Sequence, residues 1–208
     1  FTTGVESILL QGSFSAERTM ETLVREGVTN FAAAPTAYRS LLSSGLRPSA
    51  TLALRRASSA GEPLTPEIND WAERVLGITV HDHYGQTEAG MLINNHHYPS
   101  LRRPIRAGSM GHPMPGWKAA ILHAERDEEV WPGTLGRVAM DLTQSPLAWF
   151  GGYYGNPVKS SEKFSPDGRW YLTGDNGLVD DDGYFHFSSR DDDVIIMAGY
   201  RIGPFEVE

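Results

Sequence analysis

Five consecutive residues, Tyr84-Gly85-Gln86-Thr87-Glu88, combine an aromatic ring, a hydroxyl and a carboxylate around a glycine. They follow residues 77–83, whose apolar and β-branched members are typical of a buried strand. Ligands of open α/β sheets bind outside the carboxyl ends of the strands. There, the hydroxyl of Thr87 and the carboxylate of Glu88 would hold a phosphate oxygen and its metal ion together. The alternative is a polar loop that binds nothing.

A second loop of this kind, Ser59-Ala60-Gly61-Glu62-Pro63, follows a predicted strand at 52–57. If the two strands are close neighbours, both loops line one crevice, and a flat ring would fit between backbone and Tyr84. The alternative is that both loops only lead into helices, because short motifs of this kind are often structural.

Two further segments carry carboxylates. Tyr171-Leu172-Thr173-Gly174-Asp175 places an aspartate after a strand and a glycine, where it would accept two hydroxyl hydrogen bonds, as from a ribose diol. A turn bonded to its own aspartate is the alternative. The run Arg190-Asp191-Asp192-Asp193 is open to interpretation as a solvated turn, a calcium loop or a hinge. The glycine and bidentate glutamate of an EF-hand are misplaced here, which argues against calcium.

Four histidines make a zinc hydrolase a rival hypothesis: His81, His83, His96 and His97. The first two would share a strand face. However, the chain has no H-E-x-x-H motif, and we therefore favour core and loop histidines. A Gly-rich phosphate loop ending in Lys-Ser or Lys-Thr is absent, and so is a Gly-x-Ser-x-Gly elbow, which leaves a serine hydrolase without support.

The composition further limits which kinds of protein, partner and site are possible. The 208 residues suffice for one large domain or two small ones, and 40% apolar with 21% charged residues is typical of a globular protein. A net charge of −8 without a basic stripe argues against a nucleic-acid partner. No apolar run approaches the length of about 20 residues that spans a bilayer. The absence of cysteine excludes disulfides, zinc–thiolate sites and cysteine nucleophiles, and we expect a cytoplasmic protein.

The order of the elements predicts an α/β fold: a parallel-sheet α/β subdomain followed by an antiparallel β-rich subdomain, a distorted barrel. Residues 1–104 alternate predicted helices with strands at 5–10, 28–34, 52–57 and up to residue 84. Residues 105–190 hold short β-type runs between Gly, Pro and Asp, at 117–122, 136–140, 170–172 and 184–187. Residues 191–208 are interpreted as a hinge and the start of a truncated C-terminal domain.

Taken in order, these motifs resemble the adenylate-forming superfamily, which includes acyl-CoA synthetases, peptide-synthetase adenylation domains and luciferases. The likeness extends over essentially the whole chain. The matching segments are Ala34-Pro35-Thr36, Gly61-Glu62-Pro63, Tyr84-Gly85-Gln86-Thr87-Glu88, Gly108-Ser109-Met110-Gly111, Tyr171-Leu172-Thr173-Gly174-Asp175, and Arg190-Asp191-Asp192-Asp193 through Gly199-Tyr200-Arg201.

The resemblance implies a role for each matched residue. Thr87 would bind the α-phosphate of ATP, Glu88 would hold Mg²⁺, and Asp175 with Arg190 would grip the ribose. Asp192 matches the hinge of the small C-terminal domain, and Gly199 and Arg201 match the segment that meets coenzyme A. The residues expected around the adenine ring are Gly61, Glu62, Pro63, Asp82, His83 and Tyr84.

The implied reaction joins a carboxylic acid and Mg-ATP to an acyl-adenylate and pyrophosphate, and then transfers the acyl group to coenzyme A. Positioning and charge stabilisation would supply most of the rate, with Thr87, Glu88 and Arg190 as the catalytic residues. Two alternatives stay open. One is an adenylation domain of another branch that activates amino or aryl acids, and the other is a non-catalytic nucleotide-binding module.

The size of the acid is predicted from Gly85, because acetate-specific relatives carry a bulky Trp there. With Ala60 and Gly61 beside it, Gly85 is expected to leave a deep acyl pocket for an acid larger than acetate. The run Gly-Tyr-Tyr-Gly-Asn-Pro at 152–157 is similar to medium-chain acyl-CoA synthetases. We therefore expect Gly85→Trp to impair the use of longer acids.

Two parts of the family pattern find no match in these residues: the Lys-containing phosphate loop and the catalytic lysine of the C-terminal domain. The resemblance therefore predicts an internal fragment that lacks N-terminal and C-terminal parts of its own chain. We expect such a fragment to make no acyl-CoA by itself.

Overall fold

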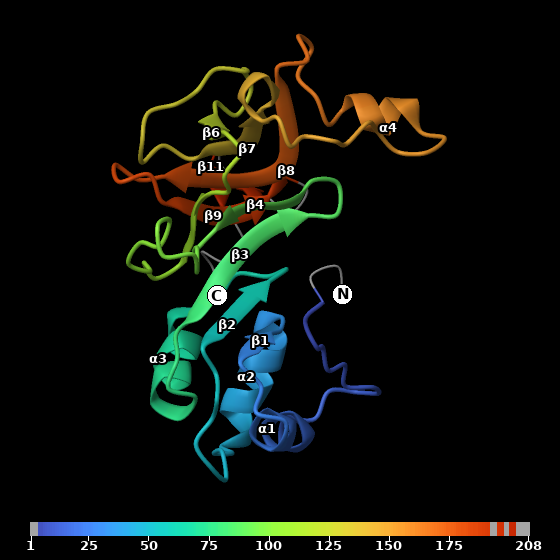
Figure 1. Ribbon diagram of the computed structural model, residues 1–208. Helices are drawn as coiled ribbons and strands as arrows, with labels where there is room; N and C mark the ends of the chain where they lie inside the picture. The colour runs from blue at the N-terminus through green and yellow to red at the C-terminus, as the bar shows by residue number, and fades with distance from the viewer. Residues whose placement is uncertain (1–3, 192–194, 198–199, 203–208) are drawn as a thin grey trace. The chain divides into compact units, whose positions relative to one another are not determined.

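The computed structural model describes residues 4–191, 195–197 and 200–202 (Figure 1). The chain divides into two compact units, residues 1–80 and 81–208, and each is described by itself. This division differs from the predicted limits 1–104, 105–190 and 191–208, which stay a prediction. Asp192 and Gly199, the expected hinge and one coenzyme A-facing residue, lie outside the described residues.

The first unit alternates helices and strands, as the sequence predicts. Its elements are α1 (Ala16–Arg25), β1 (Asn30–Ala32), α2 (Pro35–Ser44), β2 (Arg56–Ala60) and α3 (Pro66–Val75). β1 and β2 are parallel, with Phe31 opposite Ala57, which confirms the parallel α/β character. The predicted strand at 5–10 is wrong. Leu9 is 76% exposed there, and no described strand pairs with this apolar segment.

The helices of this unit begin and end at residues whose types are typical of helix ends. The Ser15 hydroxyl accepts a hydrogen bond from the Arg18 backbone N–H at 3.2 Å, which satisfies an otherwise unpaired donor of the first turn. Gly45 ends α2 with a left-handed φ of 67°, a conformation that favours glycine. Thr65 occupies the N-cap of α3, but its side chain makes no capping hydrogen bond.

One buried tyrosine ties the helices of this unit to its strands. Tyr38 of α2 is fully buried, and its hydroxyl donates to the carbonyl oxygens of Phe31 at 3.3 Å and Ser58 at 3.1 Å. Burial raises the pKa of this hydroxyl above its usual range. The same core holds apolar residues of all three helices: Met20, Leu41, Ile68, Trp71 and Ala72.

The second unit is built on an antiparallel sheet with the strand order β3-β4-β5-β9-β8-β7-β6. The antiparallel prediction is confirmed, but the sheet is open and does not close into a barrel, since among the described strands β6 pairs only with β7. Its strands are β3 (Val80–Gln86), β4 (Gly90–Asn94), β5 (Ser109–Pro113), β6 (Ala119–Leu122), β7 (Gly136–Asp141), β8 (Trp170–Val179) and β9 (Phe185–Arg190).

Shorter elements complete this unit. The 3₁₀ helix η1 (Leu142–Gln144) follows β7, and helix α4 (Pro157–Ser161) precedes β8. The strands β10 (Ile195–Met197) and β11 (Tyr200–Ile202) form a separate antiparallel pair, which includes Arg201 opposite Ile196.

The strand predicted at 77–83 lies further along the chain, as β3, and β3 forms a hairpin with β4. The turn consists of Thr87, Glu88 and Ala89, whereas Gly85 lies within β3, beside a bulge that separates it from Tyr84. A Cβ atom at Gly85 would come within 2.2 Å of the carbonyl oxygen of Gly90. Only glycine therefore permits this close approach of the two strands.

A buried carboxylate anchors the start of β8 to the end of β7. Asp141 accepts hydrogen bonds from the Arg169 guanidinium at 2.8 Å and from the Thr143 hydroxyl at 2.5 Å. Its side chain is 1% exposed. Burial opposes its ionisation, but the hydrogen bonds from Arg169 and Thr143 outweigh this effect and hold the pKa of Asp141 at about 2.

We expect Asp141→Asn to lower the free energy of unfolding at pH 7 by about 2 kcal/mol, because the charged partner of Arg169 is lost. In the wild type this contribution is present above pH 3.8 and is lost as the pH falls toward 2. Urea denaturation at pH 7 measures the difference. Asp181→Asn, at an exposed turn, is the control, and equal stability of the two variants would contradict the prediction.

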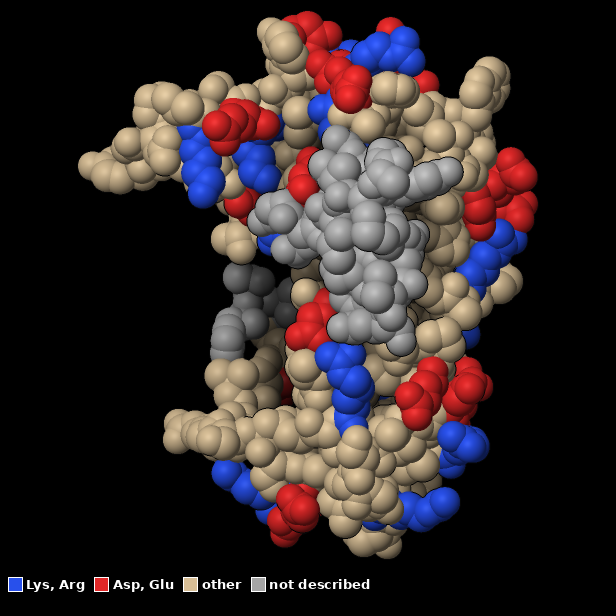
Figure 2. Space-filling model, turned by 180° about the vertical axis from the view of Figure 1, so that it is seen from behind, with Lys and Arg blue, Asp and Glu red and all other residues tan. Residues whose placement is uncertain are grey.

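The surface carries charges of both signs. On the face shown in Figure 2, acidic and basic side chains of the described residues are interspersed, without a large area of one sign. Among the described residues, no helix combines the length and apolar character needed to cross a bilayer.

Candidate functional site

The second unit holds Asp175 in a network that starts at β3. The Oδ2 atom of Asp175 accepts hydrogen bonds from the Tyr84 hydroxyl at 2.5 Å and from the Gln86 side-chain amide at 2.9 Å. The backbone N–H of Asp175 donates to the Thr173 hydroxyl at 3.1 Å. Two residues of the first predicted motif thus hold a carboxylate that lies 91 positions further along the chain.

Gln86, which received no role in the sequence analysis, is the centre of this network. Its carbonyl oxygen accepts from the Tyr171 hydroxyl at 2.8 Å, and its amide nitrogen also donates to the Thr173 carbonyl at 2.9 Å. Lys163 donates to the same Thr173 carbonyl at 2.9 Å. These partners fix the orientation of the Gln86 amide, since one end only accepts and the other only donates.

Asp175 lies opposite Arg190 in the β8–β9 register, and the two predicted ribose-binding residues are therefore neighbours. Asp175 is 7% exposed, and this burial raises its pKa, although hydrogen bonds from Tyr84 and Gln86 and the charges of Arg190 and Lys163 act in the opposite direction. The structure brings Tyr84, Asp175 and Arg190 together. The contact of Asp175 and Arg190 with a ribose stays a prediction, and so does the contact of Tyr84 with the adenine ring.

Glu88 lies in the turn between β3 and β4, beside the exposed Thr87. Its Oε1 atom accepts a hydrogen bond from the Tyr153 hydroxyl at 2.6 Å. This bond, helped by the charges of Lys163 and Arg190, lowers the pKa of Glu88, while it raises the pKa of Tyr153 to about 12. Glu88 is therefore a carboxylate at neutral pH, and the charges of Lys163 and Arg190 act on it.

Glu88 fits Mg²⁺ that is held mainly by a nucleotide. In the part of the chain that the structure describes, no three His, Asp or Glu side chains are grouped so that they could hold a metal ion. Mg²⁺ needs no such group, because it keeps several waters and takes one or two carboxylates with the substrate's phosphate oxygens. The zinc-hydrolase hypothesis, which requires three protein ligands, finds no such set among these residues.

The histidines form a cluster of stacked rings. The rings of His81 and His97 are stacked with centroids 3.7 Å apart, and His83 approaches His97 edge-on at 5.8 Å. His81 Nδ1 lies 2.8 Å from the carbonyl oxygen of Asn95, to which it donates. Burial and the neighbouring His81 and His96 lower the pKa of His83 to about 4, and burial also lowers the pKa of His81.

We expect this cluster to make the protein less stable in mild acid. An unfolded histidine titrates near pH 6.5, and a lowered folded pKa means that stability is complete above pH 6.5 and is lost as the pH falls toward 4. From pH 7 to pH 5, His83 alone should lower the free energy of unfolding by about 1–2 kcal/mol. Urea denaturation at each pH measures this loss.

His83→Gln should flatten this pH dependence, whereas His123→Gln, outside the cluster, serves as the control. An unchanged slope in His83→Gln would show that the cluster does not titrate as described.

The predicted adenine-binding residues lie in both units. Gly61, with a φ of 98°, and Glu62 follow β2 in the first unit, where Glu62 forms an ion pair with Arg39 at 2.7 Å. Asp82 and His83 belong to β3 in the second unit. The structure describes each group in its own unit, and their meeting around one adenine ring stays a prediction, as does the role of Ala60 and Pro63.

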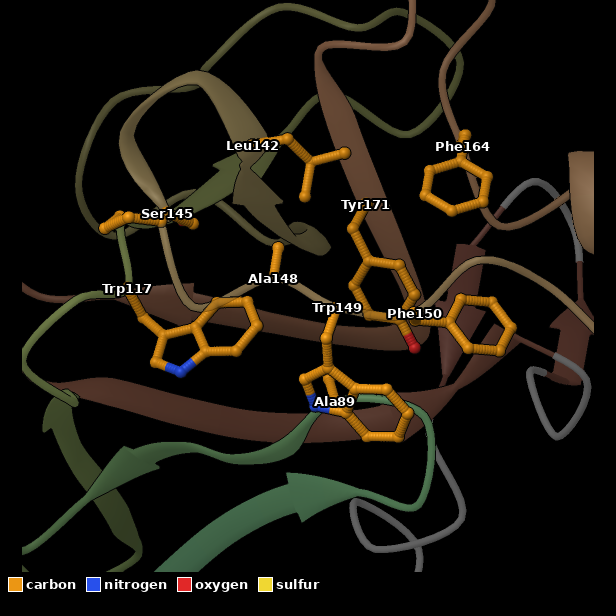
Figure 3. Close-up of a pocket in the computed structure, with 10 residues that line it drawn as sticks. Ala89, Trp117, Leu142, Ser145, Ala148, Trp149, Phe150, Phe164 and Tyr171 are labelled. Atoms are coloured by element: carbon orange, nitrogen blue, oxygen red, sulfur yellow. The ribbon is translucent and has the colours of Figure 1, made fainter.

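An apolar pocket that the sequence analysis missed opens in the second unit (Figure 3). Its volume is about 350 Å³, and Figure 3 shows rings from β8 and from several connecting segments around it. Ala89 of the β3–β4 turn and Tyr171 of β8 connect its wall to the Glu88 and Gln86 network. Gly85 and Ala60 are not among its lining residues, which include Trp117, Leu142, Trp149, Phe150 and Phe164.

Comparison with known proteins gives one consistent answer. A model of the AMP-binding enzyme family matches residues 1–154. The uncharacterized acyl–CoA ligase YtcI of Bacillus subtilis is 40% identical over 206 residues, 99% of this chain and 37% of that protein. The mitochondrial acyl-coenzyme A synthetase ACSM3 of Mus musculus is 38% identical, over 94% of this chain and 33% of that protein.

Solved structures show the same likeness to acyl-CoA synthetases. The acyl-CoA synthetase of Brucella canis is 45% identical with a TM-score of 0.79, over 99% of this chain and 37% of that chain. The chain thus spans about a third of the length of the proteins it matches. A family model that covers most of the sequence, together with these relatives, shows that the chain belongs to the AMP-binding enzyme family.

Proposed function

We propose that this chain is the nucleotide-binding part of an ATP-dependent acyl-CoA synthetase. The parent protein would convert a carboxylic acid and ATP to an acyl-adenylate and pyrophosphate, and then form the thioester with coenzyme A. The observation that carries the proposal is the β3–β4 hairpin. It presents the ionised Glu88 at its turn and holds Asp175 beside Arg190 through Tyr84 and Gln86.

The proposed role of each residue follows from its charge or its hydrogen-bonding group. The second oxygen of Asp175 would accept the ribose hydroxyls, while Oδ2 stays bonded to Tyr84 and Gln86. The exposed hydroxyl of Thr87 would bind the α-phosphate. Arg190 and Lys163, whose charges act on both Glu88 and Asp175, would stabilise the negative charge that develops on that phosphate.

The proposed reaction also uses Mg²⁺. Mg²⁺, when bound with ATP, neutralises phosphate charge during attack by the carboxylate of the acid. Glu88 is the residue of this chain that would hold it. A solved structure of the matched enzyme MatB from Rhodopseudomonas palustris contains ATP, at 28% identity and a TM-score of 0.81.

The acid is proposed to be larger than acetate. Similar proteins are named acetyl-coenzyme A synthetase, 4-hydroxybutyrate–CoA ligase 1 and anthranilate CoA ligase, and their likeness to this chain therefore does not select one acid. The support for a larger acid is Gly85, together with the small Ala60 and Gly61. We also propose a cytoplasmic location, which the absence of cysteine favours.

ATP–pyrophosphate exchange tests the function. The intact protein that contains this chain is assayed with acetate, butanoate, octanoate and benzoate, and the 208-residue chain is assayed beside it. We expect acid-dependent exchange in the intact protein and none in the chain alone. Nucleotide binding without exchange for any acid would instead favour the non-catalytic module.

A further inference from the structure

We propose that Tyr153 is a positioning residue for Glu88, an inference that rests on the proposed function of Glu88 as the carboxylate for Mg²⁺. The Tyr153 hydroxyl donates to Oε1 of Glu88 at 2.6 Å, across 65 positions of sequence. The tyrosine thus holds one carboxylate oxygen of Glu88, and the other oxygen would ligate the cation.

Glu88 needs such an anchor because of where it lies. Its turn consists of three residues between two strands, and a partly exposed glutamate there has several rotamers available. Mg²⁺ demands near-ideal octahedral geometry, so its affinity depends on where the ligand oxygen is held. Hydrogen-bond partners of ligating groups commonly change metal affinity or activity by about 10–100-fold.

Tyr153 is itself held from two sides. Its backbone N–H donates to the Ser160 hydroxyl at 2.7 Å, and that hydroxyl donates to the Asn156 carbonyl at 2.6 Å. Its ring packs edge-on against Phe150, with centroids 5.1 Å apart. Gly152 has a φ of 123°, and a Cβ there would come within 2.8 Å of the Ser160 hydroxyl, so the loop is closely fitted to α4.

The chain supplies a matched control one residue away. Tyr154 follows Tyr153 in the same loop, but it is fully exposed. Tyr153→Phe and Tyr154→Phe each remove one hydroxyl and keep the ring. A difference between the two variants therefore reports the hydrogen bond to Glu88 and not a general effect of tyrosine in this loop.

The experiment measures cation affinity directly. Mn²⁺ binding in the presence of ATP is followed by electron paramagnetic resonance in the intact wild type, Tyr153→Phe, Tyr154→Phe and Glu88→Gln. Steady-state assays with varied Mg²⁺ give KM for Mg²⁺ and kcat. We expect Tyr153→Phe to bind Mn²⁺ about 10-fold more weakly and to regain kcat at high Mg²⁺, with Tyr154→Phe equal to wild type.

The outcomes distinguish the positioning role of Tyr153 from the proposed role of Glu88. If Tyr153→Phe binds Mn²⁺ as wild type does while Glu88→Gln does not, the positioning role is wrong and the proposed function stands. If Glu88→Gln also binds as wild type does, the proposed role of Glu88 fails, and the inference about Tyr153 fails with it. An unchanged thermal midpoint in Tyr153→Phe excludes a purely structural effect.

Discussion

Replacing Glu88 with Gln is expected to slow acyl-adenylate formation in the intact protein by at least about 100-fold, because preorganised charge at a reacting phosphate commonly contributes that much. The amide oxygen still accepts the hydrogen bond from Tyr153, but the negative charge that attracts the cation is gone. The thermal midpoint should stay within a few degrees, because Glu88 lies in a turn and is not part of a buried core.

ATP–pyrophosphate exchange at saturating acid, over a series of Mg²⁺ concentrations, measures this loss. Glu162→Gln is the matched control, since Glu162 is an exposed glutamate in the same unit. An unchanged rate and an unchanged Mg²⁺ dependence in Glu88→Gln would remove Glu88 from the proposed mechanism.

Gly85→Ala is expected to lower the free energy of unfolding by about 3 kcal/mol or more. The added methyl group would lie 2.2 Å from the Gly90 carbonyl oxygen and 2.8 Å from the Met91 Cα, both of which are backbone atoms. A side chain could rotate away from such a contact, but backbone cannot, so β3 and β4 must move apart.

Gly151→Ala provides the comparison, because no atom lies within 4 Å of a Cβ at Gly151 and its φ is not left-handed. Urea denaturation of both variants measures the difference between their free energies of unfolding. Equal stability of Gly85→Ala and Gly151→Ala would show that the hairpin adapts at little cost.

The same geometry changes how Gly85→Trp should be tested. From the sequence, the small size of Gly85 is predicted to open an acyl pocket. In the structure, the Cβ direction of Gly85 leads to the backbone of β4, so a Trp there also disturbs the turn that carries Glu88. A loss of activity with longer acids is informative only if adenylation of acetate survives in the same variant.

What the sequence could predict was local. Ser15 before α1, Gly45 after α2 and the Pro66 start of α3 are signals within a few residues of the helix ends, and the helices form there. The antiparallel return of β4 could not be predicted, because Thr87, Glu88 and Ala89 carry none of the usual hairpin residues.

Contacts between residues that are far apart in the chain could not be predicted from sequence patterns. Tyr84 and Asp175 were each selected as site residues, but a hydrogen bond across 91 positions depends on which strands become neighbours. The sequence predicts no role for Tyr153 or Lys163, because a tyrosine in a glycine-rich loop and a single lysine have no distinguishing local pattern. The run that contains Tyr153 was noticed only for its family likeness.

Strand β8 determines which mutations this site can accept. Tyr171, Thr173 and Asp175 contact the Gln86 network, whereas Trp170 and Leu172, which alternate with them, belong to a separate apolar core. A one-residue insertion or deletion in the strand would exchange these two sets. We therefore expect changes of chain length to be tolerated in the flanking turns at 167–168 and 180–183 and not between Trp170 and Asp175 of β8.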